Sequence, residues 1–168
     1  DLLWKRVHQF LEEVPSYSSV TFIITMNNLS VSNLDKLMEG ILELRKTYSK
    51  DFQRVWFDTP VLRTPSWQSM QLLPAPYVMK LNKLRDWMND NLETKDDLYH
   101  GFKDYEVKRL ERDIAWAQEP LSVKYKQQQQ ADFYRFFNES DKRHMTNFLE
   151  TFPEMLEWWN ECKYYGTL

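Results

Sequence analysis

The stretch that decides the fold reads Val-Thr-Phe-Ile-Ile-Thr and occupies residues 20–25. This unbroken run of β-branched and aromatic residues is typical of a strand that is buried on both faces. Residues 54–58, Arg-Val-Trp-Phe-Asp, form a second run of the same kind. Between them, Ser32 and Asp35 resemble a capping box, and apolar side chains up to residue 48 follow helical spacing. The order strand, helix, strand predicts a βαβ unit with two parallel strands.

The remaining chain is predicted to be helical. A short amphipathic pattern over residues 3–13 precedes the first strand, and a helix that starts near Pro74 follows the second. After this helix the strand signals end, and helical patterns occupy residues 104–117, 124–138 and 153–164.

Two strands of this buried type each need neighbours, and the rest of the chain offers none. We therefore predict an α/β fold made of the C-terminal β/α units of a partial (β/α) barrel with parallel strands, followed by a helical C-terminal cap. The partial barrel would occupy residues 1–92 and the helical extension residues 93–168. On this prediction, the missing strands precede residue 1.

The composition excludes several classes of protein. The 168 residues include 22 basic and 25 acidic residues, so the net charge of −3 does not indicate a nucleic-acid binder. No apolar run approaches the roughly 20 residues of a membrane span, and no signal peptide opens the chain. Three glycines are too few for a glycine-rich phosphate loop. We expect a cytoplasmic protein without nucleic-acid or membrane partners.

Metal and disulfide chemistry are constrained by a single cysteine, Cys162. One thiol cannot form an internal disulfide, a cysteine zinc site or an iron–sulfur cluster on its own. The three histidines have no carboxylate or thiol spacing around them, so no metal site is predicted. Cys162 is expected to be a buried packing residue of the last helix.

Three segments carry more specific information. Residues 22–28 form a strand that ends in hydroxyl and amide side chains. Residues 57–74 contain prolines and the spaced side chains Trp67, Ser69, Gln71, Leu73 and Pro74. Residues 141–154 contain Asp141, Thr146, Asn147, Phe148, Phe152 and Pro153.

In this order the three segments resemble the C-terminal part of twitch-type radical SAM proteins, and they span most of residues 18–160. Their middle pattern is aromatic-x-Ser-x-Gln-x-Leu-Pro, and their last is an Asp-x-x-Arg-Gly-Thr-Asn-Phe-like motif before Phe-Pro. The chain departs from the family at His144-Met145, which stand where that pattern has Arg-Gly. The cluster motif Cys-x3-Cys-x2-Cys is also absent.

The resemblance implies an enzyme that cleaves S-adenosylmethionine reductively at a [4Fe–4S] cluster and abstracts hydrogen from a substrate. Because three thiolates are needed for such a cluster, the cofactors would belong to the full-length protein and not to this chain alone. Its partner would be the missing N-terminal barrel portion of the same protein, and it would be inactive by itself. The substrate, a small molecule or a peptide, is not indicated.

The candidate cofactor-binding residues are Thr25, Asn27 and Asn28, which follow the first strand. Polar residues at the carboxyl ends of barrel strands commonly carry function, and the resemblance implies contacts with S-adenosylmethionine. The alternative for the two asparagines is a role as turn and capping residues.

The candidate substrate-binding residues are Asp58 and Arg63, after the second strand. Asp58 would bind an amine, and Arg63 would clamp a carboxylate or phosphate. The alternative is a salt bridge between the two. The mixed charges of residues 109–113 indicate a solvated helix face.

Two other readings of the whole chain stay open. One is a non-catalytic helical module that binds another protein, and the other is a degenerate family member without a cluster. A coding sequence that supplies Cys-x3-Cys-x2-Cys upstream of Asp1 would favour the enzyme over both.

Overall fold

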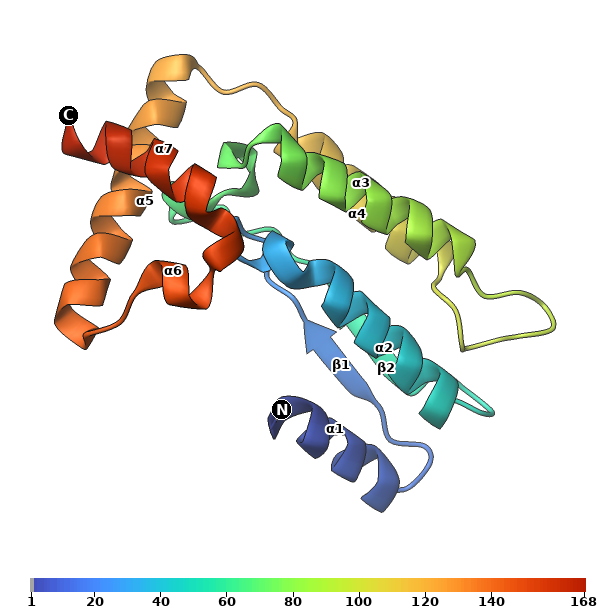
Figure 1. Ribbon diagram of the computed structural model, residues 1–168. Helices are drawn as coiled ribbons and strands as arrows, with labels where there is room; N and C mark the ends of the chain where they lie inside the picture. The colour runs from blue at the N-terminus through green and yellow to red at the C-terminus, as the bar shows by residue number, and fades with distance from the viewer. Residues whose placement is uncertain (1) are drawn as a thin grey trace.

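The computed structural model describes residues 2–168 and consists mainly of helices (Figure 1). The α-helices are α1 (Leu2–Glu13), α2 (Leu34–Tyr48), α3 (Ala75–Asp90), α4 (Asp104–Ala117), α5 (Val123–His144), α6 (Phe148–Thr151) and α7 (Leu156–Thr167). The strands are β1 (Val20–Ile23) and β2 (Val55–Asp58), and the short 3₁₀ turns are η1 (Ser30–Asn33), η2 (Ser66–Gln68), η3 (Met70–Leu72) and η4 (Pro153–Met155).

The strand–helix–strand unit is present as the hydrophobic runs predict. β1 and β2 pair in parallel, with Val20 opposite Val55 and Ile23 opposite Asp58. Helix α2 connects them and buries a stripe of apolar side chains that includes Leu34, Met38 and Ile41. The 3.6-residue period of that stripe holds the helix against the sheet.

The prediction of a partial (β/α) barrel is wrong. The sheet of the described chain has two strands of four residues each, and the second half adds only helices. The run at residues 20–25 suggested a strand buried on both faces, but the side chain of Ile23 is 73% exposed. The outer side of β2 is occupied by the Arg45 side chain, so no further strand among the described residues pairs there.

Two groups of helices extend from the sheet (Figure 1). α3 and α4 lie side by side next to α2, and α5 packs along α7 at the other end of the molecule. An aromatic cluster links this second group to η2: the Trp67 ring lies 4.4 Å from Phe136, and Phe133 lies 4.4 Å from Trp158. The core is therefore continuous from the sheet to the C-terminal helices.

Close packing of α1 on α2 depends on Gly40. A β-carbon added there would lie 2.5 Å from the ring of Trp4, which also contacts Phe22 of β1. The absence of a side chain at Gly40 therefore lets α1 approach the face of the sheet that α2 covers.

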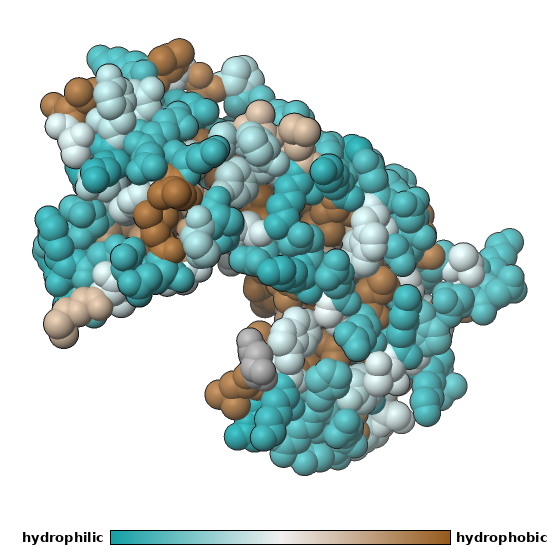
Figure 2. All heavy atoms as spheres, viewed as in Figure 1, coloured by the Kyte–Doolittle hydropathy of each residue, from teal (hydrophilic) through white to brown (hydrophobic). Residues whose placement is uncertain are grey.

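The surface in the view of Figure 2 is mainly hydrophilic and is hollowed between the C-terminal helices and α1, near the end of β1. Among the described residues, no helix has the length and apolar character that crossing a membrane requires.

Candidate functional site

The two strands end side by side, and the segments that follow them continue together. The amide of Met26 donates to the carbonyl of Pro60 at 2.7 Å, and the amide of Leu62 donates to the carbonyl of Met26 at 2.9 Å. These bonds bring the candidate residues after β1 next to those after β2.

Thr25 is the candidate whose side chain is most available. It is exposed, and its hydroxyl makes no hydrogen bond within residues 2–168. Only its carbonyl is used, as an acceptor from Asn27 Nδ2 at 3.1 Å. The hydroxyl is therefore free to bind a ligand at the strand end.

Asn27 organises the turn that follows β1. Its Oδ1 accepts from the amides of Leu29 at 2.8 Å and Ser30 at 3.1 Å, and its Nδ2 donates to Thr25. These bonds form the turn that the alternative interpretation describes. A cofactor would have to compete with them.

Asn28 is fully buried and joins two of the segments that carry the family resemblance. Its Nδ2 donates to the carbonyl of Trp67 at 2.9 Å, and its amide donates to the carbonyl of Gln68 at 3.0 Å. Its Oδ1 is buried without a hydrogen-bond partner in the described chain. The residue thus anchors η2 against the loop after β1.

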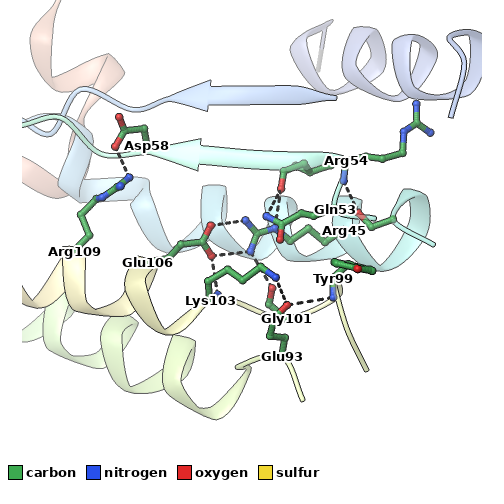
Figure 3. Close-up of polar contacts among 12 residues, drawn as sticks. Arg45, Gln53, Arg54, Asp58, Glu93, Tyr99, Gly101, Lys103, Glu106 and Arg109 are labelled. Atoms are coloured by element: carbon green, nitrogen blue, oxygen red, sulfur yellow. Dashed lines mark hydrogen bonds and ion pairs between the residues drawn. The ribbon is translucent and has the colours of Figure 1, made fainter. Parts of the chain in front are cut away.

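Asp58 pairs with a residue other than the one expected. Its carboxylate, 54% exposed, accepts from the amide of Thr59 at 2.8 Å and forms an ion pair with Arg109 of α4 (Figure 3). Arg63 is exposed and forms no ion pair with any described residue. The structure therefore separates the two predicted substrate-binding residues and leaves the guanidinium of Arg63 available.

Arg63 lines a hollow of about 250 Å³ together with Arg112 and Trp116 of α4. The hollow also contains Asp113, whose carboxylate accepts from the Thr59 hydroxyl at 3.0 Å. Burial raises the pKa of the Asp113 carboxyl above its ordinary value. Arg112 Nη2 lies 3.4 Å from the Asp113 carboxylate, so Arg63 carries the guanidinium that is available to a planar anion such as a carboxylate.

Sequence reasoning did not assign Arg109, Arg112 or Asp113 to this site. Their mixed charges indicate a solvated face, whereas Arg109 pairs with Asp58 at the end of β2 and Asp113 accepts from Thr59 directly after it. The buried side of α4 carries Val107, Leu110 and Ile114. The helical spacing of these apolar residues could have predicted which charged side chains of α4 face the interior.

The residues present do not fit an iron–sulfur cluster. Cys162 is fully buried on α7, and burial raises the pKa of its thiol far above the ordinary value. The expectation of a buried packing residue is confirmed. Within residues 2–168, no group of three or more His, Cys, Asp and Glu side chains is placed to hold a metal ion.

The third resembling segment caps helices. Asp141 accepts from the Thr146 hydroxyl and from the amide of Phe148, both at 2.8 Å, and Asn147 accepts from the amide of Leu149 at 3.0 Å. Met145, between α5 and this cap, has a left-handed backbone with φ of 54°.

Comparisons of the chain with protein-family models, with curated proteins and with solved structures find no match.

Proposed function

We propose that this chain is the part of a radical SAM enzyme that does not hold the cluster. The observation that carries the proposal is that the three segments that resemble the family, although distant in sequence, contact one another in the fold. Asn28 of the first bonds to Trp67 of the second, and the Trp67 ring packs on Phe137, which packs on Phe148 of the third. Residues that contact one another in this way behave as one structural unit.

The backbone at Met145 supports the same proposal. The family pattern has glycine at this position, and φ of 54° is a conformation that glycine adopts at no steric cost. Met145 departs from the family pattern, but its left-handed backbone still favours the glycine that the pattern has at this position.

In the proposed enzyme, S-adenosylmethionine and a cluster held by another segment supply the radical chemistry. This chain contributes the ends of two strands: the hydroxyl of Thr25 is free to bind a polar ligand, and Arg63 is free to bind an anionic group of the substrate. Asp58 and Arg109 neutralise each other at the same edge.

The test is anaerobic reconstitution of the natural polypeptide, extended upstream of Asp1, with iron, sulfide and S-adenosylmethionine. We expect a three-cysteine motif in the extension, a [4Fe–4S] absorbance and formation of 5′-deoxyadenosine after reduction. An extended polypeptide without this motif, or one that binds a cluster but forms no 5′-deoxyadenosine, would contradict the proposal.

Variants of that enzyme test the role of the strand ends. Arg63→Ala should raise KM for an anionic substrate by roughly 10-fold, because a charge-assisted contact is lost. Arg143→Ala is the matched control, since Arg143 is exposed on α5 and, among residues 2–168, pairs only with Glu139. An equal KM for both variants would remove Arg63 from the site.

A substitution in the chain as it stands tests the link to the family pattern. Met145→Gly should stabilise the fold by about 1 kcal/mol, because a side chain in the left-handed region costs about that much. The measurement is urea unfolding, with Met79→Gly in helix α3 as a control that should destabilise instead. A destabilised Met145→Gly variant would contradict this account of the turn.

A further inference from the structure

A cavity of about 480 Å³ lies between the start of α3 and helix α7, beside Ser32 of η1 (Figure 1). Cavities of this size commonly take small-molecule ligands. Its lining shares no residue with the hollow beside Arg63. The cavity is therefore separate from the candidate site at the strand ends.

The charge of the cavity lining is mainly negative. Glu157 and Glu161 stand four positions apart on one face of α7, and Glu154 precedes them in η4. Neither Glu154 nor Glu157 forms an ion pair within residues 2–168. Lys80 also lines the cavity, but it pairs with Asp35 at 3.0 Å. The glutamates thus keep a negative charge that a cationic ligand would neutralise.

Tyr77 of α3 supplies an aromatic wall. Its hydroxyl donates to the carbonyl of Glu154 at 3.3 Å. Burial raises the pKa of the Tyr77 hydroxyl, and the negative charges of Glu154 and Glu157 raise it further. Carboxylates beside an aromatic ring form an environment that suits a guanidinium group, which pairs with the former and stacks on the latter.

Trp158 of α7 also lines the cavity, and its side chain is almost fully buried. Phe133 of α5 packs on the Trp158 ring at 4.4 Å. The Nε1 of Trp158 has no hydrogen-bond partner among residues 2–168. A buried indole N–H usually finds an acceptor, because leaving it without one costs free energy. A carbonyl oxygen of a ligand in the cavity would be such an acceptor.

We propose that this cavity binds a small guanidinium compound that also carries a carbonyl group, as derivatives of arginine do. The guanidinium would pair with the carboxylates of Glu154 and Glu157 and stack on Tyr77. The carbonyl would accept from Trp158 Nε1. The site would thus select for a positive charge and an acceptor in the same molecule.

An organic cation fits the lining better than a metal ion. Within residues 2–168, no group of three or more His, Cys, Asp and Glu side chains is placed to hold one ion. A guanidinium spreads five donors over a planar fork, so it can contact carboxylates that are too far apart to share a metal.

This inference does not rest on radical chemistry. Binding can be measured on the chain alone, without a cluster, S-adenosylmethionine or turnover. Its failure and the failure of the proposed enzymatic function are therefore separate results.

The experiment is a calorimetric titration of the chain with argininamide. Citrullinamide, which has nearly the same shape but no charge on its side chain, is the control ligand. We expect saturable one-to-one binding of argininamide, and binding of citrullinamide that is weaker by at least roughly 10-fold, because charge-assisted hydrogen bonds are lost. Equal affinities, or no saturable binding of argininamide, would overturn the proposal.

A variant of the acidic face locates the binding site. Glu157→Gln should weaken argininamide binding by roughly 10-fold, because one charged acceptor is lost from an exposed side chain that the fold does not need. Glu150→Gln, the same change at an exposed residue of α6 outside the cavity lining, should leave binding unchanged. Equal affinities of the two variants would place the ligand elsewhere.

A third ligand tests the role of the indole. Agmatine has the guanidinium of argininamide but no carbonyl, so the chain should bind argininamide more tightly than agmatine. Trp158→Phe keeps a buried ring and removes the N–H, and this preference should then disappear. A purely structural role of Trp158 would weaken both ligands alike, and an unchanged preference would contradict the proposed contact.

The same titration on the natural full-length polypeptide separates a free ligand from a side chain of the protein itself. Argininamide should bind the full-length protein as tightly as it binds residues 1–168. Loss of binding in the full-length protein would overturn the proposal, since the occupant of the cavity would then be another segment of the same polypeptide.

Discussion

The two outer edges of the small sheet are built in opposite ways. On β2, the carbonyl of Val55 accepts from Arg45 Nε at 2.9 Å and from Gln53 Nε2 at 3.0 Å, and both side chains are buried (Figure 3). On β1, the outward groups of Thr21 and Ile23 have no partner in residues 2–168.

The closed edge is held by a buried ion pair. Arg45 donates to both carboxylate oxygens of Glu106 at 2.9 and 2.7 Å and to the carbonyl of Gly101 at 2.9 Å. Phe57 and Phe102 lie within 5.4 and 5.6 Å of the guanidinium. On β2 a charged side chain from α2 thus takes the place of a neighbouring strand, whereas no described residue bonds to the outward backbone amides of β1.

The largest expected effect comes from breaking the closed edge. Glu106→Gln should cost about 3–5 kcal/mol of unfolding free energy, because it leaves the Arg45 charge buried and uncompensated. Urea denaturation measures it. The exposed Glu111 on the same helix gives the matched control, and Glu111→Gln should change stability by less than about 0.5 kcal/mol. Similar losses for both variants would show that the pair does not hold this edge.

The next largest loss of stability is expected at Gly101, which packs against the backbone beside the ion pair. A β-carbon at Gly101 would lie 2.3 Å from the Glu93 nitrogen and 2.5 Å from the Leu92 carbonyl carbon. Gly101→Ala should therefore cost about 1–3 kcal/mol through overpacking. At Gly166 the nearest atoms belong to the Tyr134 side chain, which can move, so Gly166→Ala should cost less. The reverse order in thermal unfolding would contradict the packing described.

The free energy of unfolding should also depend on pH, through the side chain of His100. Its ring bonds to the Asp97 carboxylate and to the Ser49 carbonyl, and these two acceptors raise the pKa of His100 above its ordinary value. The stabilisation is thus fully present below the unfolded-state pKa of about 6.5 and is lost as pH rises through the folded-state pKa. The loss should be about 1 kcal/mol or less, since the site is partly solvated.

The variant Asp97→Asn checks this pH effect. It removes the larger cause of the raised pKa, so the difference in unfolding free energy between pH 6 and pH 8.5 should shrink. An unchanged pH dependence in Asp97→Asn would rule out His100 as its source.

The smallest effect is expected at the open edge. Ile23→Thr should change the free energy of unfolding by less than about 0.5 kcal/mol, because the side chain is 73% exposed. The same hydroxyl introduced at the fully buried Val55 should cost about 1–3 kcal/mol. Equal costs in chemical denaturation would mean that the side chains of Ile23 and Val55 are buried alike.

The local sequence pattern predicts the two strands, α2 and the parallel order of the strands, because each depends on residues close in sequence. It does not predict what covers the outer edge of β2. Arg45 acts through Val55, Gly101 and Glu106, which are 10, 56 and 61 positions away, and no local signal pairs them. The hydrophobic runs predict neighbouring strands on both sides and hence a barrel, but the Arg45 side chain occupies one of those sides.

The candidate site shows the same limit. Sequence placed Thr25 and Arg63 at the strand ends, where the structure leaves their side chains free. The sequence does not predict the ion pair between Arg109 and Asp58, or the burial of Asn28 against Trp67. Both contacts join residues 39 or more positions apart.

The difference between the two sides of β1 is tested most directly by native-state amide hydrogen exchange, read residue by residue by NMR on the chain alone. The amides of Thr21, Ile23 and Thr25 should exchange at least roughly 10-fold faster than those of Phe22 and Ile24, which bond to β2. Protection of all five amides to the same degree would contradict it, because the outer edge of β1 would then already be covered.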